Sequence, residues 1–199
     1  MRRVISGIQE NKVSKPQIVG ISGNLASPSR TLSLVVSTAE RIARESGGEA
    51  RVLDISDLWG LGEIRSRAGA PPAVEAALKA VEQADLLVVG SPVYKGSYTG
   101  LFKHFIDFID YRSLIGTPVA LLATGGSDRH ALVIEHQLRP LFGFFQAQVL
   151  GTGIFLTEKD FSDGEITDAV LKARFDQLVR EGVDALRPFR SGARTEAAA

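Results

Sequence analysis

The amino-acid sequence predicts an α/β fold in which helices cover both faces of a parallel sheet. Short apolar runs alternate along the chain with segments whose apolar residues recur every three or four positions, which is the pattern of strands alternating with amphipathic helices. The 199 residues, 44% of them hydrophobic, suffice for one domain with a substantial core. We therefore expect a single domain with right-handed crossovers between its strands.

Five apolar runs are predicted as strands. The first four are rich in β-branched residues or leucine and show no clear alternation, which is typical of strands buried on both faces. The five runs cover residues 17–22, 51–55, 86–91, 119–124 and 149–156.

Five segments between and after these runs are predicted as helices. In residues 31–44, Leu32, Val35 and Ala39 fall on one side of a helix and would face the sheet. Ser29 is expected to cap the start of this helix, because its hydroxyl oxygen can accept from an unpaired backbone N–H. The other predicted helical segments are 72–84, 99–110, 141–145 and 166–186.

The charge balance and the lack of cysteine exclude several classes of function. The 23 Lys and Arg residues balance 23 Asp and Glu residues, so the chain has no bulk attraction for nucleic acid or an anionic membrane. Without cysteine it can form no disulfide framework, zinc–thiolate site or cysteine nucleophile, and redox chemistry would need a bound cofactor. The composition fits a reducing compartment, and we expect a cytoplasmic protein that binds small molecules.

The two ends of the sequence are expected to lie outside the folded domain. Residues 1–16 are predicted as a flexible leader, 17–188 as the domain and 189–199 as a flexible tail. The apolar stretch at 4–8 is too short and mixed for a signal peptide, and the end SGARTEAAA is small and polar. No run of 18 apolar residues occurs, so no membrane-spanning helix is expected.

The loop after the first predicted strand is a candidate phosphate site. Ligands of an open parallel sheet bind beyond the carboxyl ends of its strands, and residues 22–31 run from such an end directly into a helix. Small hydroxyl residues beside Arg30 add donors to the unpaired N–H groups of the helix start. An ordinary loop with a serine cap is an equally good interpretation of this segment alone. The loop lacks both the dinucleotide GxGxxG pattern and the GK[ST] of a nucleotide P-loop.

Two further loops follow the third and fourth predicted strands. In residues 91–100, Tyr94 would offer an aromatic wall, and the glycines would let backbone approach a flat ligand closely. In residues 124–130, two glycines before a Ser or Asp cap would place several N–H donors together. Taken alone, residues 91–100 fit an ordinary turn with packed tyrosines better than a binding loop, and two glycines before a helix are a weak signal. Three such loops on these three strands nevertheless favour a binding site.

Other chemistry-bearing residues give weaker signals. The three histidines form no HExxH pattern, so a metal site is not expected. His104 shares the polar side of its predicted helix with Lys103 and Asp107, which favours a solvated or interface position. The absence of GxSxG weakens a serine hydrolase interpretation.

These segments together resemble a known family. SGNLASPSRT, SPVYKGSYTGLFKHFID, LLATGGSDRHAL and EHQLRPLF are similar to the NAD(P)H-dependent FMN reductases, and most closely to the reductase partners of two-component alkanesulfonate and methanesulfonate monooxygenases. The resemblance covers residues 17–161. It implies a flavodoxin-like fold, a doubly wound five-stranded parallel sheet of order 2-1-3-4-5.

The resemblance also implies roles for individual residues. The FMN phosphate would contact the first loop, the isoalloxazine ring would lie along the second, and the polar edge of the ring would meet the third; no acid, base or nucleophile would be needed for hydride transfer. His136 would lie in a π-bulge at a subunit interface. Independently of the resemblance, the charges of Lys95 and Arg129 are suited to steering an anionic nucleotide, although basic residues near a cleft are often only solvated. The implied cofactor-binding residues are Ser22, Ser29, Arg30, Thr31, Pro92, Val93, Tyr94, Lys95, Thr124, Gly125 and Gly126.

The implied activity is hydride transfer from nicotinamide C4 to flavin N5, with NADH or NADPH as donor and reduced FMN released to a flavin-dependent monooxygenase of sulfonate or organosulfur metabolism. An FMN-bound quinone or azo reductase is one alternative, and a flavodoxin-type electron carrier is another, although such carriers are usually acidic. Phenylalanines concentrate in two helical segments, which predicts a homodimer or homotetramer. These residues are Phe102, Phe105, Phe108, Phe142, Phe144 and Phe145. A thick monomer core is the alternative.

Overall fold

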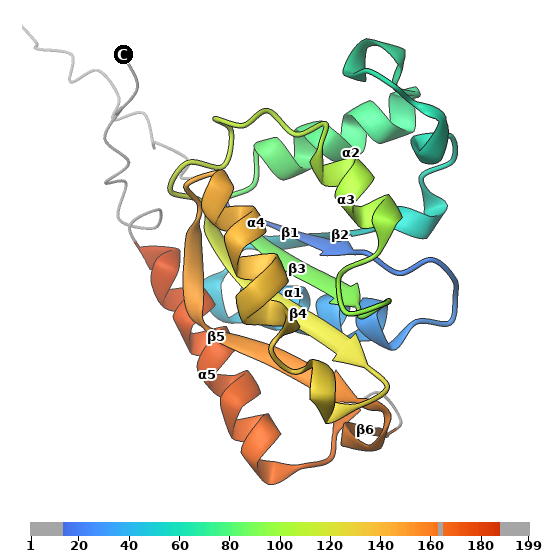
Figure 1. Cartoon of the computed structure of the whole chain (residues 1–199). Coiled ribbons are helices and arrows are strands. Elements are labelled where there is room, and N and C mark those ends of the chain that lie inside the picture. Colours follow the sequence, from blue (N-terminus) through green and yellow to red (C-terminus); the bar gives the residue numbers. More distant parts are fainter. Residues whose placement is uncertain (1–13, 163–164, 188–199) are drawn as a thin grey trace, which may run out of the picture.

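A computed structural model describes residues 14–162 and 165–187 and confirms the predicted α/β class (Figure 1). Five strands form one sheet in the order β2-β1-β3-β4-β5, and all four neighbouring pairs are parallel. The strands are β1 (Gln17–Ser22), β2 (Glu49–Asp54), β3 (Leu86–Pro92), β4 (Pro118–Gly125) and β5 (Gln148–Thr157). The chain reverses its direction of progress across the sheet between β1 and β3, which is the position where ligands of doubly wound sheets bind.

The predicted strands lie within two residues of the observed ones, but the expected burial is wrong for β2. The central strands β1, β3 and β4 are buried along nearly their whole length. In β2, by contrast, Glu49, Ala50 and Arg51 are exposed, and only Leu53 is buried. The reason is position: β2 is an edge strand, and the helices cover only its carboxyl half, where Val52 and Leu53 join the two cores.

The helices also follow the prediction, with shifted ends. They are α1 (Arg30–Ser46), α2 (Pro72–Glu82), α3 (Gly100–Ile106), α4 (Arg139–Phe144) and α5 (Ala169–Ala185). Ser29 is the N-cap of α1, as predicted, and its Oγ accepts from the N–H of Leu32 at 3.1 Å. Gly47, with φ of 74°, ends this helix in the left-handed conformation that glycine adopts without strain. The predicted helix at 166–186 begins late because β6 (Phe161–Ser162) pairs with β7 (Glu165–Ile166) first.

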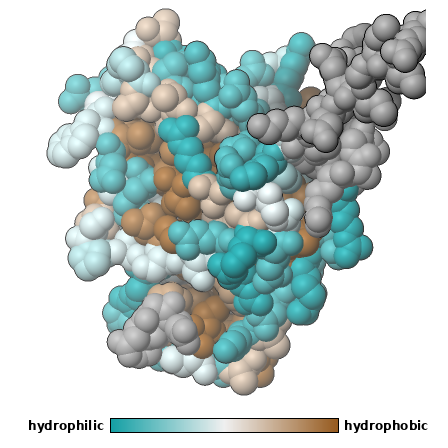
Figure 2. Space-filling model, turned by 180° about the vertical axis from the view of Figure 1, so that it is seen from behind, coloured by the Kyte–Doolittle hydropathy of each residue, from teal (hydrophilic) through white to brown (hydrophobic). Residues whose placement is uncertain are grey.

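The sheet separates two hydrophobic cores. On one face, α2, α3 and α4 cover a core that includes the fully buried Phe102, Phe105 and Phe142. On the other face, α1 and α5 cover a core that includes Leu34 and Leu178 (Figure 1). The reverse side of the molecule is mainly hydrophilic, and its hydrophobic residues lie mostly in recesses (Figure 2).

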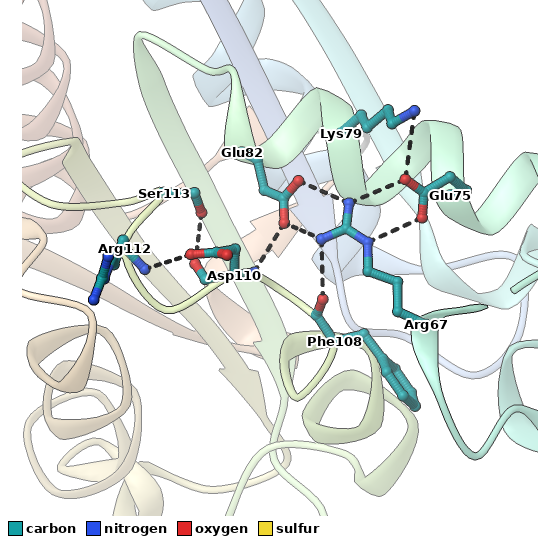
Figure 3. Close-up of polar contacts among 8 residues, drawn as sticks. All are labelled: Arg67, Glu75, Lys79, Glu82, Phe108, Asp110, Arg112 and Ser113. Carbon is teal, nitrogen blue, oxygen red and sulfur yellow. Dashed lines mark hydrogen bonds and ion pairs between the residues drawn. The ribbon is translucent and has the colours of Figure 1, made fainter. Parts of the chain in front are cut away.

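The segment between β2 and α2 contains three short helical turns that the sequence pattern did not predict: η1 (Ile55–Asp57), η2 (Leu61–Glu63) and η3 (Arg67–Gly69). Arg67 holds this segment against its neighbours (Figure 3). Its guanidinium donates to both carboxylate oxygens of Glu75 at 3.0 and 3.1 Å and to Glu82 at 2.8 Å. It also donates to the carbonyl of Phe108 at 3.4 Å, so one side chain joins η3, α2 and the chain after α3.

The predicted leader and tail fall largely outside the described residues, which begin at 14 and end at 187; the predicted domain boundaries stay predictions. Among the described residues, no helix combines the length and apolarity needed to cross a membrane.

Candidate functional site

A cleft of about 320 Å³ opens where β1, β3, β4 and β5 end at the carboxyl edge of the sheet. This volume is at the lower end of the range for small-molecule sites, roughly 300 to 1,000 Å³. Hydroxyl groups, apolar side chains, one guanidinium and one carboxylate line the cleft. Nine of the predicted cofactor-binding residues are among the lining residues: Ser29, Arg30, Thr31, Pro92, Val93, Tyr94, Thr124, Gly125 and Gly126.

The loop after β1 is supported from beneath by a chain of polar contacts. Ser22 is fully buried and donates from Oγ to Oδ1 of Asn24. Nδ2 of Asn24 donates to Oδ2 of Asp54 at 3.2 Å and to the carbonyl of Ala26 at 3.3 Å. Asn24 itself lines the cleft. Ser22, which the sequence placed among the ligand contacts, does not line the cleft and instead supports Asn24.

The start of α1 lies close to the end of β4 because β3 has a glycine between them. A Cβ on Gly90 would lie 2.4 Å from Cγ2 of Val35 and 3.2 Å from Cγ2 of Thr31, so only glycine allows α1 to pack this closely on the sheet. At this distance Thr31 and Thr124 share a hydrogen bond of 2.6 Å between their hydroxyl oxygens. The predicted phosphate loop and the predicted polar-edge loop are therefore in direct contact.

The loop after β3 turns back on itself directly beyond the cleft. Tyr94 and Ser97 exchange backbone hydrogen bonds of 2.8 and 3.2 Å, and Lys95 and Gly96 between them have φ of 53° and 83°. Two consecutive positive φ values are typical of a tight type I′ turn. Tyr94 thus stands at the mouth of the cleft, half exposed, whereas Lys95 occupies the tip of the turn and does not line the cleft.

The loop after β4 lines the cleft next to the loop after β3. The carbonyl of Thr124 accepts from the N–H of Val93 at 2.8 Å, which joins the second and third loops. A Cβ on Gly125 would lie 2.8 Å from Cζ of Phe155, so the backbone here packs directly on an aromatic ring. Ser127 caps the following turn, with its Oγ accepting from the N–H of Arg129 at 3.3 Å.

The sequence prediction missed a fourth side of the cleft, formed by the end of β5 and the turn η6 (Glu158–Asp160). Thr157, Glu158 and Phe161 line the cleft, and Glu158 forms an ion pair with Arg30. Oδ2 of Asp160 accepts from the backbone N–H and from Oγ1 of Thr157, at 2.8 and 2.6 Å, and so closes the turn. The sequence held one signal for these residues: they follow a strand whose carboxyl end shares an edge with the other three.

His136 lies in a π-helix over Ile134–Leu138 and is exposed. The neighbouring Gln137 accepts from Oγ of Ser97 through its Oε1 at 3.0 Å, so the π-helix contacts the loop that carries Tyr94. The placement of His136 at a subunit interface stays a prediction.

His104, for which the helical pattern favoured a solvated or interface position, is not fully solvated. Its side chain is half-buried and packs edge-on against the ring of Phe108, with 5.0 Å between ring centres. Its Nε2 is fully buried and has no hydrogen-bond partner within the described chain. Leu101, three positions before His104, approaches Gly62 in the segment between β2 and α2, so this part of α3 is partly covered. An interface position for His104 stays a prediction.

The donor set of the cleft suits a ligand with a phosphate at one end and a flat ring at the other. Ser29, Arg30 and Thr31 gather hydroxyl groups and a cation at the start of a 17-residue helix. Val93 and Tyr94 form an apolar wall opposite. Within residues 14–162 and 165–187, no group of three or more His, Asp or Glu side chains is arranged to hold a metal ion.

The fold has known structural relatives. An oxidoreductase from Corynebacterium diphtheriae superposes with a TM-score of 0.78 at 32% identity and covers 86% of this chain and 96% of its own. The NADH:FMN oxidoreductase EMOB superposes with a TM-score of 0.80 at 27% identity, over 86% of this chain and 90% of its own. An archaeal flavodoxin shares the fold alone, at 14% identity and a TM-score of 0.57 over 87% of this chain and 99% of its own.

The sequence comparisons identify the family. The NADH-dependent FMN reductase SfnF of Pseudomonas fluorescens is 50% identical over 164 residues, which are 81% of this chain and 88% of that protein. An FMN reductase (NADPH) of Pseudomonas aeruginosa is 47% identical over 79% of this chain and 86% of its own. The family model for NADPH-dependent FMN reductases matches residues 16–162, and the chain therefore belongs to the NADPH-dependent FMN reductase family.

Proposed function

We propose that this chain reduces FMN as a diffusible substrate and supplies reduced FMN to a flavin-dependent monooxygenase. Family membership makes the chain an oxidoreductase that uses FMN with a reduced nicotinamide. The observation that carries the proposal is the convergence of all three predicted loops on one open cleft. The sequence resemblance to the reductase partners of sulfonate monooxygenases supports a partner of that class.

The residues at the start of α1 fit the FMN phosphate. Ser29 and Thr31 offer hydroxyl groups, Arg30 offers a guanidinium, and the positive end of the α1 dipole adds to their attraction. At neutral pH a phosphate monoester carries a charge of about −1.5 to −2, and Arg30 is the one cation among the described residues that line the cleft. We therefore place the phosphate beside Arg30.

The other loops fit the ring. Pro92, Val93 and Tyr94 form a wall along which a flat ring can lie, and the backbone at Gly125 and Gly126 can approach the polar edge of that ring closely. Hydride acceptance from the reduced nicotinamide is the chemistry that bound FMN supplies. The protein aligns the two rings and places N–H dipoles where negative charge develops. Tyr94 is half exposed at the mouth of the cleft. We propose that the reduced nicotinamide enters beside it.

We also propose that two or four chains assemble through the segment around the π-helix. Exposed residues recur there every four positions on one side: Leu132, His136, Pro140 and Phe144. Phe144 is 71% exposed and Leu132 61%, which is unusual for large apolar side chains so close together. Light scattering of the purified protein measures the mass, and F144E is expected to shift it toward the monomer.

Steady-state kinetics with NADH or NADPH test the proposed activity. FMN added in excess over enzyme should be turned over many times, and the nicotinamide with the higher kcat/KM identifies the physiological donor. Turnover only with quinones or azo dyes, with FMN retained by the protein, would instead indicate an FMN-bound quinone or azo reductase. FMN binding without nicotinamide oxidation would indicate an electron carrier.

A further inference from the structure

We propose that Glu158 lowers the affinity of the cleft for FMN by competing with the phosphate for Arg30, so that FMN exchanges as a substrate rather than staying bound. The inference rests on the proposed function, in which Arg30 contacts the phosphate. It assigns a role in flavin affinity to a residue that the sequence did not single out.

The geometry of the ion pair carries the argument. Nη2 of Arg30 contacts Oε1 of Glu158, and both side chains line the cleft. Among the lining residues that the structure describes, Arg30 and Glu158 are the two charged ones, so the described carboxylate of the cleft is paired with its described cation. A phosphate bound beside Arg30 would have to share this guanidinium with Glu158 or displace it, and the carboxylate would repel the phosphate in either case.

The surroundings hold Glu158 in this position. The turn η6 is closed by the two bonds from Thr157 to Asp160, and the next residue, Lys159, donates from Nζ to Oδ2 of Asp128 at 2.7 Å. The turn therefore contacts the loop after β1 through Glu158 and the loop after β4 through Lys159. These contacts keep the backbone of Glu158 at the edge of the cleft, beside Arg30.

The exposure of the pair sets the size of the effect. The side chains of Arg30 and Glu158 are 49% and 75% exposed, so their attraction is screened by water and is worth roughly a factor of two to five in an equilibrium constant. Repulsion between Glu158 and a phosphate of about two negative charges adds a similar factor. An effect of this size tunes affinity without abolishing binding.

The test compares FMN with riboflavin, which has the same ring and no phosphate. Dissociation constants are measured from the quenching of flavin fluorescence in the wild type and in E158Q, which keeps the size of the side chain. E158Q is expected to bind FMN roughly four to 25 times more tightly, to bind riboflavin unchanged, and to lose most of its advantage in 1 M salt. E45Q removes a carboxylate that pairs with Arg41 on the same helix, away from the cleft, and should change neither constant.

A double-mutant cycle attributes the effect to Arg30. R30Q should weaken FMN binding to near the riboflavin level, and E158Q should have less effect in that background than in the wild type. If E158Q weakens FMN binding, leaves it unchanged or shifts FMN and riboflavin equally, the inference is wrong and Glu158 only shapes the cleft.

The same measurements separate this inference from the proposed function. Equal wild-type affinities for FMN and riboflavin would refute the phosphate site itself. An absence of nicotinamide oxidation with FMN would refute the activity while leaving the affinity comparison interpretable. Urea unfolding of each variant verifies that the measured constants belong to folded protein.

Discussion

Two arginines in this molecule pair with carboxylates in very different settings. Arg67 donates to Glu75, Glu82 and a backbone carbonyl, and its side chain is only 30% exposed. Arg30 makes one contact, with Glu158, and is 49% exposed. The first arginine uses the full fork of its guanidinium, whereas the second leaves most of its donors free.

The difference shows how surroundings decide what an ion pair does. The hydrogen bonds that Arg67 donates to Glu82 and Glu75 raise the pKa of its guanidinium above its ordinary value. Glu82 also accepts from the backbone N–H of Asp110 at 2.8 Å, so the cluster holds three segments together (Figure 3). At the cleft mouth a single exposed pair can be exchanged for a ligand. Pairs of arginine and glutamate thus stabilise the fold at Arg67 and allow a ligand to exchange at Arg30.

The largest expected effect is that of R67A on stability. The substitution leaves Glu75 and Glu82 facing each other without their shared cation, and we expect a loss of about 2 to 4 kcal/mol in the free energy of unfolding. Urea denaturation measures this loss. R67K keeps the charge without the bidentate geometry and should fall between R67A and the wild type. The dissociation constant of folded R67A for FMN should equal that of the wild type. A large change would mean that the contacts of Arg67 and the cleft are coupled.

The contribution of Arg67 should also depend on pH. The hydrogen bond from Arg67 lowers the pKa of Glu75, so the charged carboxylate is favoured more in the folded chain than in the unfolded one. This stabilisation is fully present above the ordinary glutamate pKa of about 4.3 and is lost as the pH falls through the lowered value. The difference in unfolding free energy between wild type and R67A should be constant from about pH 7 to 5 and shrink below about pH 4. A difference that grows on acidification would contradict the assignment.

At the cleft mouth, D160A should have a smaller effect. Asp160 accepts two hydrogen bonds that close the turn η6, and loss of such a cap costs about 1 kcal/mol. D160N keeps an acceptor oxygen and is the matched control. Thermal unfolding measures both, and equal destabilisation by the two variants would show that charge, not the cap, matters here.

The smallest effect is expected for K159Q. The side chains of Lys159 and Asp128 are 67% and 69% exposed, and such pairs contribute between about 0 and 1 kcal/mol. Thermal unfolding of K159Q should show a change in unfolding free energy near the lower end of this range. A loss of unfolding free energy comparable to that of R67A would mean that the exposed pair of Lys159 and Asp128 stabilises the fold as strongly as the contacts of Arg67 do, which would contradict the comparison.

The sequence predicted the fold well because the signals for the fold are local. Apolar runs and three-to-four periodicity reflect burial by neighbouring elements, so each strand and helix could be located on its own. The segment from η1 to η3 escaped prediction because its turns have no period, and Arg67 is held there by residues 8 and 15 positions further along the chain.

The site was predicted in part for a related reason. Ser29, Arg30 and Thr31 were found because a helix start after a strand is a local pattern. Glu158 was missed because it reaches Arg30 across 128 positions of sequence, and only the strand order brings the two together. Lys95 was assigned to the site by its motif, but it lies in the tight turn beyond β3 and is not among the lining residues; its role stays a prediction.

The glycine at position 90 has a consequence for motion. It lets α1 lie directly on the strands, so the wall of the cleft that carries Thr31 is part of the rigid core. The neighbouring side of the cleft, with Glu158, is a short turn held by exposed polar contacts. We expect amide hydrogens in α1 to exchange far more slowly than those of η6. The side of the cleft formed by η6 would then be mobile, while the side formed by α1 stays rigid.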